Sequence, residues 1–235
     1  MRNVIVTDPP RADLAEVDKL AGFGVATVHE ATGRAGYLGP GIRPNQQGAR
    51  IAGTALTVLC WPGDNLMIHA AVEQARPGDV IVIATTSPSS DGAFGELLAT
   101  SLASRGVRGL VTGAGLRDTR ELREMGFPAW TAHVSAQGTV KETPGSVNVP
   151  VTLGGQLIRP GDAIVADDDG ACVVPRGDVP GAVTASAARI AREDATRRQL
   201  ADGVLGVDLY GLRPKLAAVE RISYAEYVKR ASQDG

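Results

Sequence analysis

The chain of 235 residues is poor in the residues that mark several common classes of protein. Its two cysteines, Cys60 and Cys172, are too few for a disulfide scaffold, and both lie in apolar, strand-like runs. Free buried thiols in a reducing cytosol are therefore expected, with a single disulfide as the alternative. The three histidines, His29, His69 and His133, show no paired-ligand spacing, so no zinc site is predicted. His69 falls within a helical pattern and is interpreted as a structural residue.

Long apolar runs and blocks of one charge are also missing. No apolar run approaches the ~20 residues needed to span a bilayer, and residues 1–10 are polar, without the apolar core of a secretory signal. The formal net charge is −2 with acids and bases interspersed, which predicts no surface for nucleic acid. Together these absences predict a cytoplasmic globular protein with neither a membrane nor a nucleic-acid partner.

The sequence lacks motifs for a serine nucleophile, for dinucleotide binding and for a Schiff-base lysine. No Gly-x-Ser-x-Gly elbow occurs, and Gly113–Gly115 is too short to match a dinucleotide fingerprint. No lysine lies in an apolar strand, where desolvation would lower its pKa enough for a Schiff base. The lysines are Lys19, Lys141, Lys215 and Lys229. An enolate or other carbanion intermediate would therefore need a metal to stabilise it.

Apolar, β-branched runs alternate along the chain with helical patterns. Strands are expected at Arg50–Trp61, Val80–Thr85, Val107–Thr112, Ala129–Val134, Val147–Val151, Gln156–Ala166 and Ala171–Pro175. Helices are expected at Ala12–Ala21, Val25–Thr32, Asn65–Ala75, Gly95–Ser104, from Asp118 onward, and Val179–Ala201. The order strand, helix, strand, helix in the middle indicates an α/β crossover with parallel strands. With no repeat or linker, we expect one domain over residues 1–235, with its core at about 25–176, a C-terminal helix at about 179–201 and a tail at 202–235.

Two loops should lie beyond the carboxyl ends of parallel strands, where α/β proteins bind ligands. They are Thr85–Phe94 and Gly113–Leu116, and each leads into a helix. The second loop delivers Arg117 and Asp118 together, a cation for an oxyanion and a carboxylate for a metal. As alternatives, Asp118 serves equally well as a helix N-cap, and Arg117 as a solvated loop charge. 

The helix that follows the first of these loops offers unpaired amides at its start. We expect the amides of Glu96, Leu97 and Leu98 to form a carboxylate cradle, with Gly95 allowing close approach of a ligand. The Glu96 side chain has an alternative role, since an acid in a first turn stabilises the helix dipole. The acidic run Asp167–Gly170 is explained better by a hairpin turn than by a metal cluster.

Several motifs together resemble one family. Glu96 is followed after twenty residues by Arg117 and Asp118, and three further stretches match in order. These stretches are Gly63–Leu66, Val134–Thr139 and Asp167–Gly170. The chain resembles the 4-hydroxy-4-methyl-2-oxoglutarate/4-carboxy-4-hydroxy-2-oxoadipate aldolases, the enzymatic branch of the family that includes the RraA-like ribonuclease regulators. The resemblance runs from about Val25 to Arg213, and it departs from the family at Glu96, where the first acid is usually Asp.

The resemblance implies a compact α/β RraA-like domain, with a β-sandwich-like core flanked by helices. It also implies trimers that can pair into hexamers, an active site at a subunit interface, and a C-terminal helix packed on a neighbouring subunit. Glu193 falls where the family places an acid from that neighbour, although a helix-surface pair with Arg197 is an alternative.

For the site itself, the resemblance implies that Asp118 ligates Mg²⁺ or Mn²⁺ and that Arg117 contacts the substrate keto oxygen and carboxylate. Residues Gly95–Leu98 would bind the pyruvyl carboxylate through backbone amides, and Glu96 would order metal-bound water. The expected activity is divalent-metal-dependent cleavage of an oxo-dicarboxylic or oxo-tricarboxylic acid to pyruvate and a second keto acid. Oxaloacetate decarboxylation is expected as a side activity. Arg43 or Arg123 is a candidate to bind the distal carboxylate.

Two other functions remain as alternatives. One is a non-enzymatic regulator on the same fold that binds a ribonuclease or a helicase, since fold does not fix function. A regulator has no need of Glu96, Arg117 and Asp118 at this spacing, which favours the enzyme. The other is a related metal-dependent lyase or a dedicated decarboxylase.

Overall fold

The computed structural model of the chain describes residues 3–233. It divides into two compact units, Met1–Ile190 and Ala191–Gly235, and helix α6 (Val179–Ala201) crosses the boundary between them. The second unit also holds α7 (Gly206–Leu209), a 3₁₀ helix η1 (Arg213–Leu216) and α8 (Tyr224–Ala231). None of the helices in the described part of the chain is long and apolar enough to span a membrane.

A nine-stranded sheet forms the centre of the first unit, with a main path in the order β1-β6-β5-β3-β2-β10-β11. Two short strands lie off this path, β4 beside β5 and β7 beside β2, and β8 and β9 form a separate two-stranded sheet. The strand bounds are β1 (Arg43–Pro44), β2 (Ile51–Cys60), β3 (Asp79–Thr85), β4 (Gly92–Phe94), β5 (Gly109–Leu116), β6 (Ala129–Val134), β7 (Ser146–Val147), β8 (Val151–Leu153), β9 (Gln156–Ile158), β10 (Ala163–Asp167) and β11 (Gly170–Val174).

The four strands β2, β3, β5 and β6 are parallel, as the crossover pattern predicts. Alternate residues of β3 face opposite sides of the sheet: Val80 and Val82 join one apolar core, and Ile81 and Ile83 join another. Both faces are covered, which is why β3 reads as a continuous apolar run rather than an alternating one. The carboxyl ends of the four parallel strands meet at one edge of the sheet, where the candidate loops begin.

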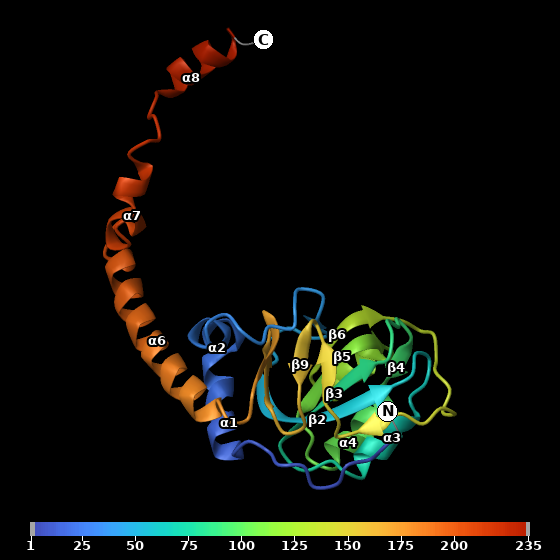
Figure 1. Cartoon of the computed structure of the whole chain (residues 1–235). Helices are drawn as coiled ribbons and strands as arrows, with labels where there is room; N and C mark the ends of the chain where they lie inside the picture. The colour runs from blue at the N-terminus through green and yellow to red at the C-terminus, as the bar shows by residue number, and fades with distance from the viewer. Residues whose placement is uncertain (1–2, 234–235) are drawn as a thin grey trace. The chain divides into compact units, whose positions relative to one another are not determined.

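Helices cover the outer faces of the sheet. α3 (Leu66–Val72), α4 (Glu96–Ala103) and α5 (Thr119–Glu124) pack on β2, β3 and β5 around one core. α1 (Leu14–Phe23), α2 (Val25–Ala31) and the start of α6 pack on β10 and β11 around a second core. Figure 1 shows α1 and α2 on one flank of the sheet, and α3 and α4 on the other.

The sheet curls back on itself around a third core. The buried Trp130 of β6 donates its indole N–H to the Asp167 carbonyl at the end of β10, at 2.7 Å. Three strands, β5, β3 and β2, lie between β6 and β10 in the order of the sheet, so this contact joins its distant parts. This interior core contains Trp130, Ile164 and Val173, with Leu153 and Ile158 from the β8–β9 hairpin. A mixed, barrel-like sheet flanked by helices results, and the predicted α/β class is confirmed.

Three expectations for the strands are wrong in detail. Gly113–Gly115 is not a loop but part of β5, because the missing side chains let a neighbouring backbone pass: a Cβ at Gly115 would lie 2.4 Å from the Ser90 carbonyl oxygen. The expected run Gln156–Ala166 is two strands, β9 and β10, separated by a turn in which Gly161 has a φ of +78°. The expected run Val147–Val151 is likewise divided, into β7 and β8, at Asn148 with φ +56°.

The acidic run Asp167–Gly170 forms the turn of the β10–β11 hairpin, as predicted. The buried Asp167 carboxylate accepts hydrogen bonds from the amides of Asp169 and Val25, and so has a structural role. Both cysteines are buried free thiols, and burial raises the pKa of each to about 12. The expectation of two buried free thiols is confirmed, and neither thiol is ionised at neutral pH.

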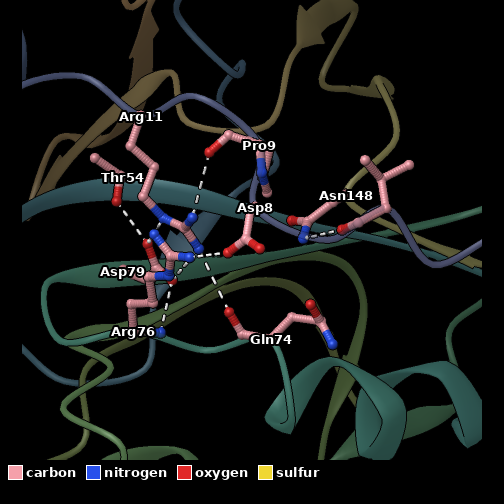
Figure 2. Close-up of polar contacts among 9 residues, drawn as sticks. Asp8, Pro9, Arg11, Thr54, Gln74, Arg76, Asp79 and Asn148 are labelled. Atoms are coloured by element: carbon pink, nitrogen blue, oxygen red, sulfur yellow. Dashed lines mark hydrogen bonds and ion pairs between the residues drawn. The ribbon is translucent and has the colours of Figure 1, made fainter.

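A buried carboxylate fixes the N-terminal segment to the amino end of β3 (Figure 2). Asp79 is 0% exposed and accepts two hydrogen bonds from the Arg11 guanidinium, at 2.9 and 3.0 Å. The Thr54 hydroxyl and the Arg76 amide donate to the same carboxylate, at 2.6 and 2.9 Å. Four donors thus compensate the removal of this charge from water.

Candidate active site

Five of the predicted site residues, Gly95, Leu97, Leu98, Arg117 and Asp118, meet at the carboxyl edge of the parallel strands. Gly95 at the start of α4 and the pair Arg117 and Asp118 after β5 line one hollow of about 100 Å³. Its other lining residues are Asn65, His69, Ala93, Leu97, Leu98 and Lys141. A second, more open hollow of about 330 Å³ lies against the same Arg117 and Asp118, on the side of Val134, Ser135 and Ala136. The Arg117–Asp118 pair therefore lines both hollows.

Asp118 occupies the N-cap position of α5, but its side chain does not cap that helix. Its backbone is left-handed, with a φ of +52°, and its Oδ2 instead accepts a hydrogen bond from the amide of Glu96 at 3.2 Å. Asp118 is partly exposed at the hollow. The N-cap alternative is thus correct for the backbone position and wrong for the carboxylate, which lies at the start of α4.

The Arg117 side chain runs beside the Asp118 carboxylate, with 3.6 Å between its Nε and Asp118 Oδ2. Its own amide donates to the Phe94 carbonyl at 2.9 Å, which joins the end of β5 to the end of β4. A Cβ built at Gly138 would lie 3.2 Å from the Arg117 guanidinium, so this glycine of the Val134–Thr139 motif passes close to it. Arg117 is therefore a partly exposed cation held between two loops.

Glu96, Leu97 and Leu98 form the first turn of α4, as expected. The Glu96 carboxylate accepts a hydrogen bond from the Thr100 hydroxyl one turn further along the helix, at 2.9 Å. Leu97 is 77% exposed, whereas Leu98 is buried in the core below the hollow. The start of α4 thus presents the Glu96 amide to the Asp118 carboxylate, whereas the Glu96 side chain lies along the helix against Thr100 and lines neither hollow.

Three residues that line the hollow are not predicted as site residues from the sequence: Asn65, His69 and Lys141. His69 lies on α3 as expected, but its side chain is exposed and lines the hollow instead of joining the core. The amide of Asn65 is buried, and its Oδ1 has no hydrogen-bond partner within residues 3–233. On this wall of the hollow, the Gly63–Leu66 motif is the one sequence feature that includes a lining residue, Asn65. No motif includes Lys141.

Although His69 is exposed, its imidazole is partly desolvated by the residues around it, and this desolvation together with the positive charge of Lys141 lowers its pKa. His69 is therefore neutral at pH 7, and Lys141 and Arg117 are the cations among the residues described around this hollow.

Replacement of Lys141 by methionine should raise the pKa of His69, because one of the two causes of its depression disappears while the desolvation remains. A proton NMR titration of the imidazole would measure the shift. The matched substitution Lys229→Met in α8 should leave the His69 titration unchanged. An unchanged or lowered His69 pKa in Lys141→Met would contradict the proximity of the two side chains.

The absence of a side chain at Gly95 leaves room for the side chains of Asp118 and Arg117. A Cβ at this position would lie 2.2 Å from Asp118 Oδ2 and 3.1 Å from Arg117 Cγ, closer than such atoms can approach. The Gly95 backbone is extended, with a φ of −152°, so a substitution here acts through steric overlap alone.

The substitution Gly95→Ala should displace the Asp118 carboxylate and lower catalytic efficiency about 10²-fold, the scale expected for misplacing a reactive group by about 1 Å. Steady-state kinetics and circular dichroism would test this. Gly22→Ala in α1, where a Cβ meets nothing within 4 Å, is the matched control and should leave activity unchanged. Equal activity of both variants would show that the close packing at Gly95 has no functional role.

The other sequence candidates lie elsewhere or are not placed. Arg43 begins β1, and Arg123 on α5 donates to the Asn45 side chain at 3.2 Å; neither lines the two hollows that Arg117 and Asp118 share. Glu193 belongs to the second unit, so its place at the site stays a prediction. Arg197, the alternative partner for Glu193, forms an ion pair with Asp194.

The donor set of the hollow fits a hard divalent cation. It offers the carboxylate of Asp118 and the unsatisfied amide oxygen of Asn65, and no thiol. Within residues 3–233 no three His, Cys, Asp or Glu side chains gather into an all-protein metal cage. Mg²⁺ and Mn²⁺ need no such cage, because they prefer oxygen ligands and retain water alongside one or two carboxylates.

The chain is similar in sequence to a known protein family. Residues 12–173 match the family model described as RraA-like: Aldolase/RraA. A protein of Halalkalibacterium halodurans named "Putative 4-hydroxy-4-methyl-2-oxoglutarate aldolase" is 32% identical over 72% of this chain and 80% of its own length. A protein of Burkholderia multivorans with the same name is 34% identical over 61% of this chain and 87% of its own length.

A solved structure also matches the fold. Streptomyces coelicolor RraAS2, described as an unusual member of the RNase ES inhibitor RraA protein family, superposes with a TM-score of 0.74 at 30% identity. The superposition covers 81% of this chain and 99% of that chain, which confirms the predicted fold. The chain belongs to the RraA-like family.

Proposed function

We propose that the protein is a divalent-metal-dependent aldolase that releases pyruvate from a 4-hydroxy-2-oxo acid. The observation that carries this proposal is the meeting of the Asp118 carboxylate, the Arg117 guanidinium and the first turn of α4 at one hollow. Asp118 can hold the cation, Arg117 can pair with the oxyanion that forms on the substrate, and the start of α4 can bind the substrate carboxylate. The names of the two curated relatives support the same reaction.

In this proposal Asp118 holds Mg²⁺ or Mn²⁺, with Glu96 ordering water beside it. When bound, the cation would act as a Lewis acid toward the 2-oxo acid. The backbone amides at the start of α4 bind the carboxylate next to the keto group. The Glu96 amide now donates to Asp118, so it becomes available once that carboxylate turns toward a cation.

The reaction then follows from the position of Arg117. Water accepts the proton of the C4 hydroxyl, the C3–C4 bond breaks, and its electron pair moves into the C2–C3 enolate. The Arg117 guanidinium stabilises the negative charge that develops on the C2 oxygen. A proton delivered to C3 gives pyruvate, and the C4 fragment leaves as the second keto acid. Oxaloacetate decarboxylation forms the same enolate and is proposed as a side activity.

We also propose that the protein works as a homo-oligomer, a trimer or a pair of trimers, in which α6 reaches a neighbouring subunit and contributes Glu193. The surface of the second unit supports this proposal. No residue of α7, η1 or α8 is buried, and large side chains such as Tyr210, Tyr224 and Tyr227 are exposed. Exposed apolar surface of this kind is typical of an interface.

A second candidate function is regulation of a ribonuclease, because the RraAS2 structure is described as a member of an RNase inhibitor family. A protein that acts only by binding another protein needs no hollow lined by Arg117 and Asp118, which favours the enzyme.

The deciding experiment measures pyruvate release from 4-hydroxy-4-methyl-2-oxoglutarate and from 4-carboxy-4-hydroxy-2-oxoadipate, with Mg²⁺ and then with EDTA. Turnover that needs the metal is expected with at least one of the two substrates. Oxaloacetate serves as a separate substrate to detect a dedicated decarboxylase. Folded protein that binds Mg²⁺ but turns over none of the three acids would overturn the proposal in favour of the regulator.

A further inference from the structure

The segment of residues 140–143 is fixed firmly beside the hollow. The Val140 amide donates to the Gly63 carbonyl at 2.9 Å, and the Asn65 amide donates to the Val140 carbonyl at 3.0 Å. The amides of Glu142 and Thr143 both donate to Asp64 Oδ2, at 2.8 and 2.7 Å. Four hydrogen bonds therefore hold the backbone on either side of residue 141.

The carboxylate of Asp64, which anchors this segment, is stabilised in its charged form. Asp64 is 3% exposed, and its Oδ1 accepts the Leu66 amide at 2.8 Å, so it also fixes the start of α3. Burial by itself raises the pKa of Asp64, but the amides of Leu66, Glu142 and Thr143 outweigh this effect, and the pKa is lowered. The anchor thus joins α3 and residue 141 into one wall of the hollow.

Lys141 is the charged side chain that this wall presents. It is exposed, and it lines the same hollow as Gly95, Arg117 and Asp118. No carboxylate within the described residues forms an ion pair with it. An ammonium group mounted on a rigid backbone and left without a protein counter-ion can bind an anion that enters the hollow.

We propose that Lys141 binds the carboxylate carried on C4 of the substrate, and so makes the site selective for oxo-dicarboxylic acids. This inference rests on the proposed function, because it takes the hollow to be the site of a 2-oxo acid. The carboxylate beside the keto group already has partners in Arg117 and the α4 amides. Lys141 comes from a different wall, at α3, and adds the positive charge that a second carboxylate needs.

A binding experiment separates the two carboxylates without any turnover. 2-Oxoglutarate carries a carboxylate on C4 but no C4 hydroxyl, so it cannot undergo the aldol cleavage, and pyruvate lacks the second carboxylate altogether. Isothermal titration calorimetry with Mg²⁺ present would compare both acids on the wild type, Lys141→Met and the control Lys229→Met. Loss of a charge-assisted contact should weaken 2-oxoglutarate binding by about 10- to 100-fold in Lys141→Met. Pyruvate binding should change less than about threefold.

Kinetics provide a second arm. 4-Hydroxy-2-oxopentanoate keeps the C4 hydroxyl and methyl groups of 4-hydroxy-4-methyl-2-oxoglutarate but has a hydrogen in place of the C4 carboxylate. Lys141→Met should reduce the preference for the dicarboxylic acid, measured as the ratio of kcat/KM values, by about 10- to 100-fold. Lys141 is exposed, so circular dichroism should show an unchanged fold.

The outcomes distinguish this inference from the function on which it rests. Equal weakening of pyruvate and 2-oxoglutarate would overturn it, because Lys141 would then serve the carboxylate beside the keto group. Unchanged binding of both acids would overturn it as well. Wild-type protein that binds neither acid would overturn the proposed function and the inference together. Selective loss of 2-oxoglutarate binding without aldol turnover in the wild type would support Lys141 and overturn the aldolase alone.

Discussion

Replacement of Asp118 by asparagine is expected to lower kcat/KM for pyruvate release by at least about 10³-fold. The substitution keeps the size of the side chain and an oxygen that can accept the Glu96 amide, so the local backbone should be retained. It removes the one carboxylate proposed to ligate the cation. Lewis-acid stabilisation of a developing oxyanion is worth several kcal/mol, and about 4 kcal/mol corresponds to a factor of 10³ in rate.

Cation binding provides a measurement that does not depend on turnover. Mn²⁺ affinity, followed by electron paramagnetic resonance, should fall sharply in Asp118→Asn. Glu121→Gln is the matched control, since it removes one negative charge from an exposed position three residues further along the chain. Wild-type Mn²⁺ affinity and wild-type turnover in Asp118→Asn would show that the carboxylate holds no catalytic metal.

The sequence predicts this side of the site well because its signals are local. A strand that ends in Leu116, followed by Arg117 and Asp118 and then a helix, places both charges at the carboxyl edge of a parallel sheet. The conformation of Asp118 is not local. Its left-handed φ and its bond to the Glu96 amide depend on α4, which precedes it by more than fourteen residues. Local sequence alone therefore does not decide whether Asp118 caps α5 or ligates a metal.

The opposite wall of the hollow could not be predicted in the same way. Lys141 lies in a polar segment with neither helical nor strand periodicity, and its place depends on the buried hydrogen bonds of Asp64, more than seventy residues earlier. The glycines of β5 show the same limit. Local sequence assigns Gly113–Gly115 to a loop, whereas close approach of the Ser90 backbone makes glycine necessary within a strand. Contacts between distant segments decided both cases.

The largest effect on stability is expected from Arg11→Met. Asp79 is fully buried and the Arg11 side chain is 14% exposed, so this ion pair is largely protected from water (Figure 2). Removal of Arg11 leaves the carboxylate with the Thr54 hydroxyl and the Arg76 amide as donors. Breaking a buried pair by removing one partner costs about 3–5 kcal/mol. In a protein of this size the loss corresponds to a fall in Tm of roughly 6–20 °C.

Thermal and urea denaturation would measure the effect, with Arg34→Met as the control. Arg34 also forms an ion pair, with Glu30 at 2.9 Å, but its side chain is 74% exposed and pairs of this kind contribute about 0.5 kcal/mol or less. Asp79 begins β3, whereas the candidate site lies beyond the other end of that strand, so kcat/KM well below the unfolding transition should not change. If Arg11→Met and Arg34→Met prove equally stable, the N-terminal segment does not depend on the Asp79 carboxylate. Adding Asp79→Asn to Arg11→Met should recover part of the lost stability, because the variant no longer buries an unpaired charge.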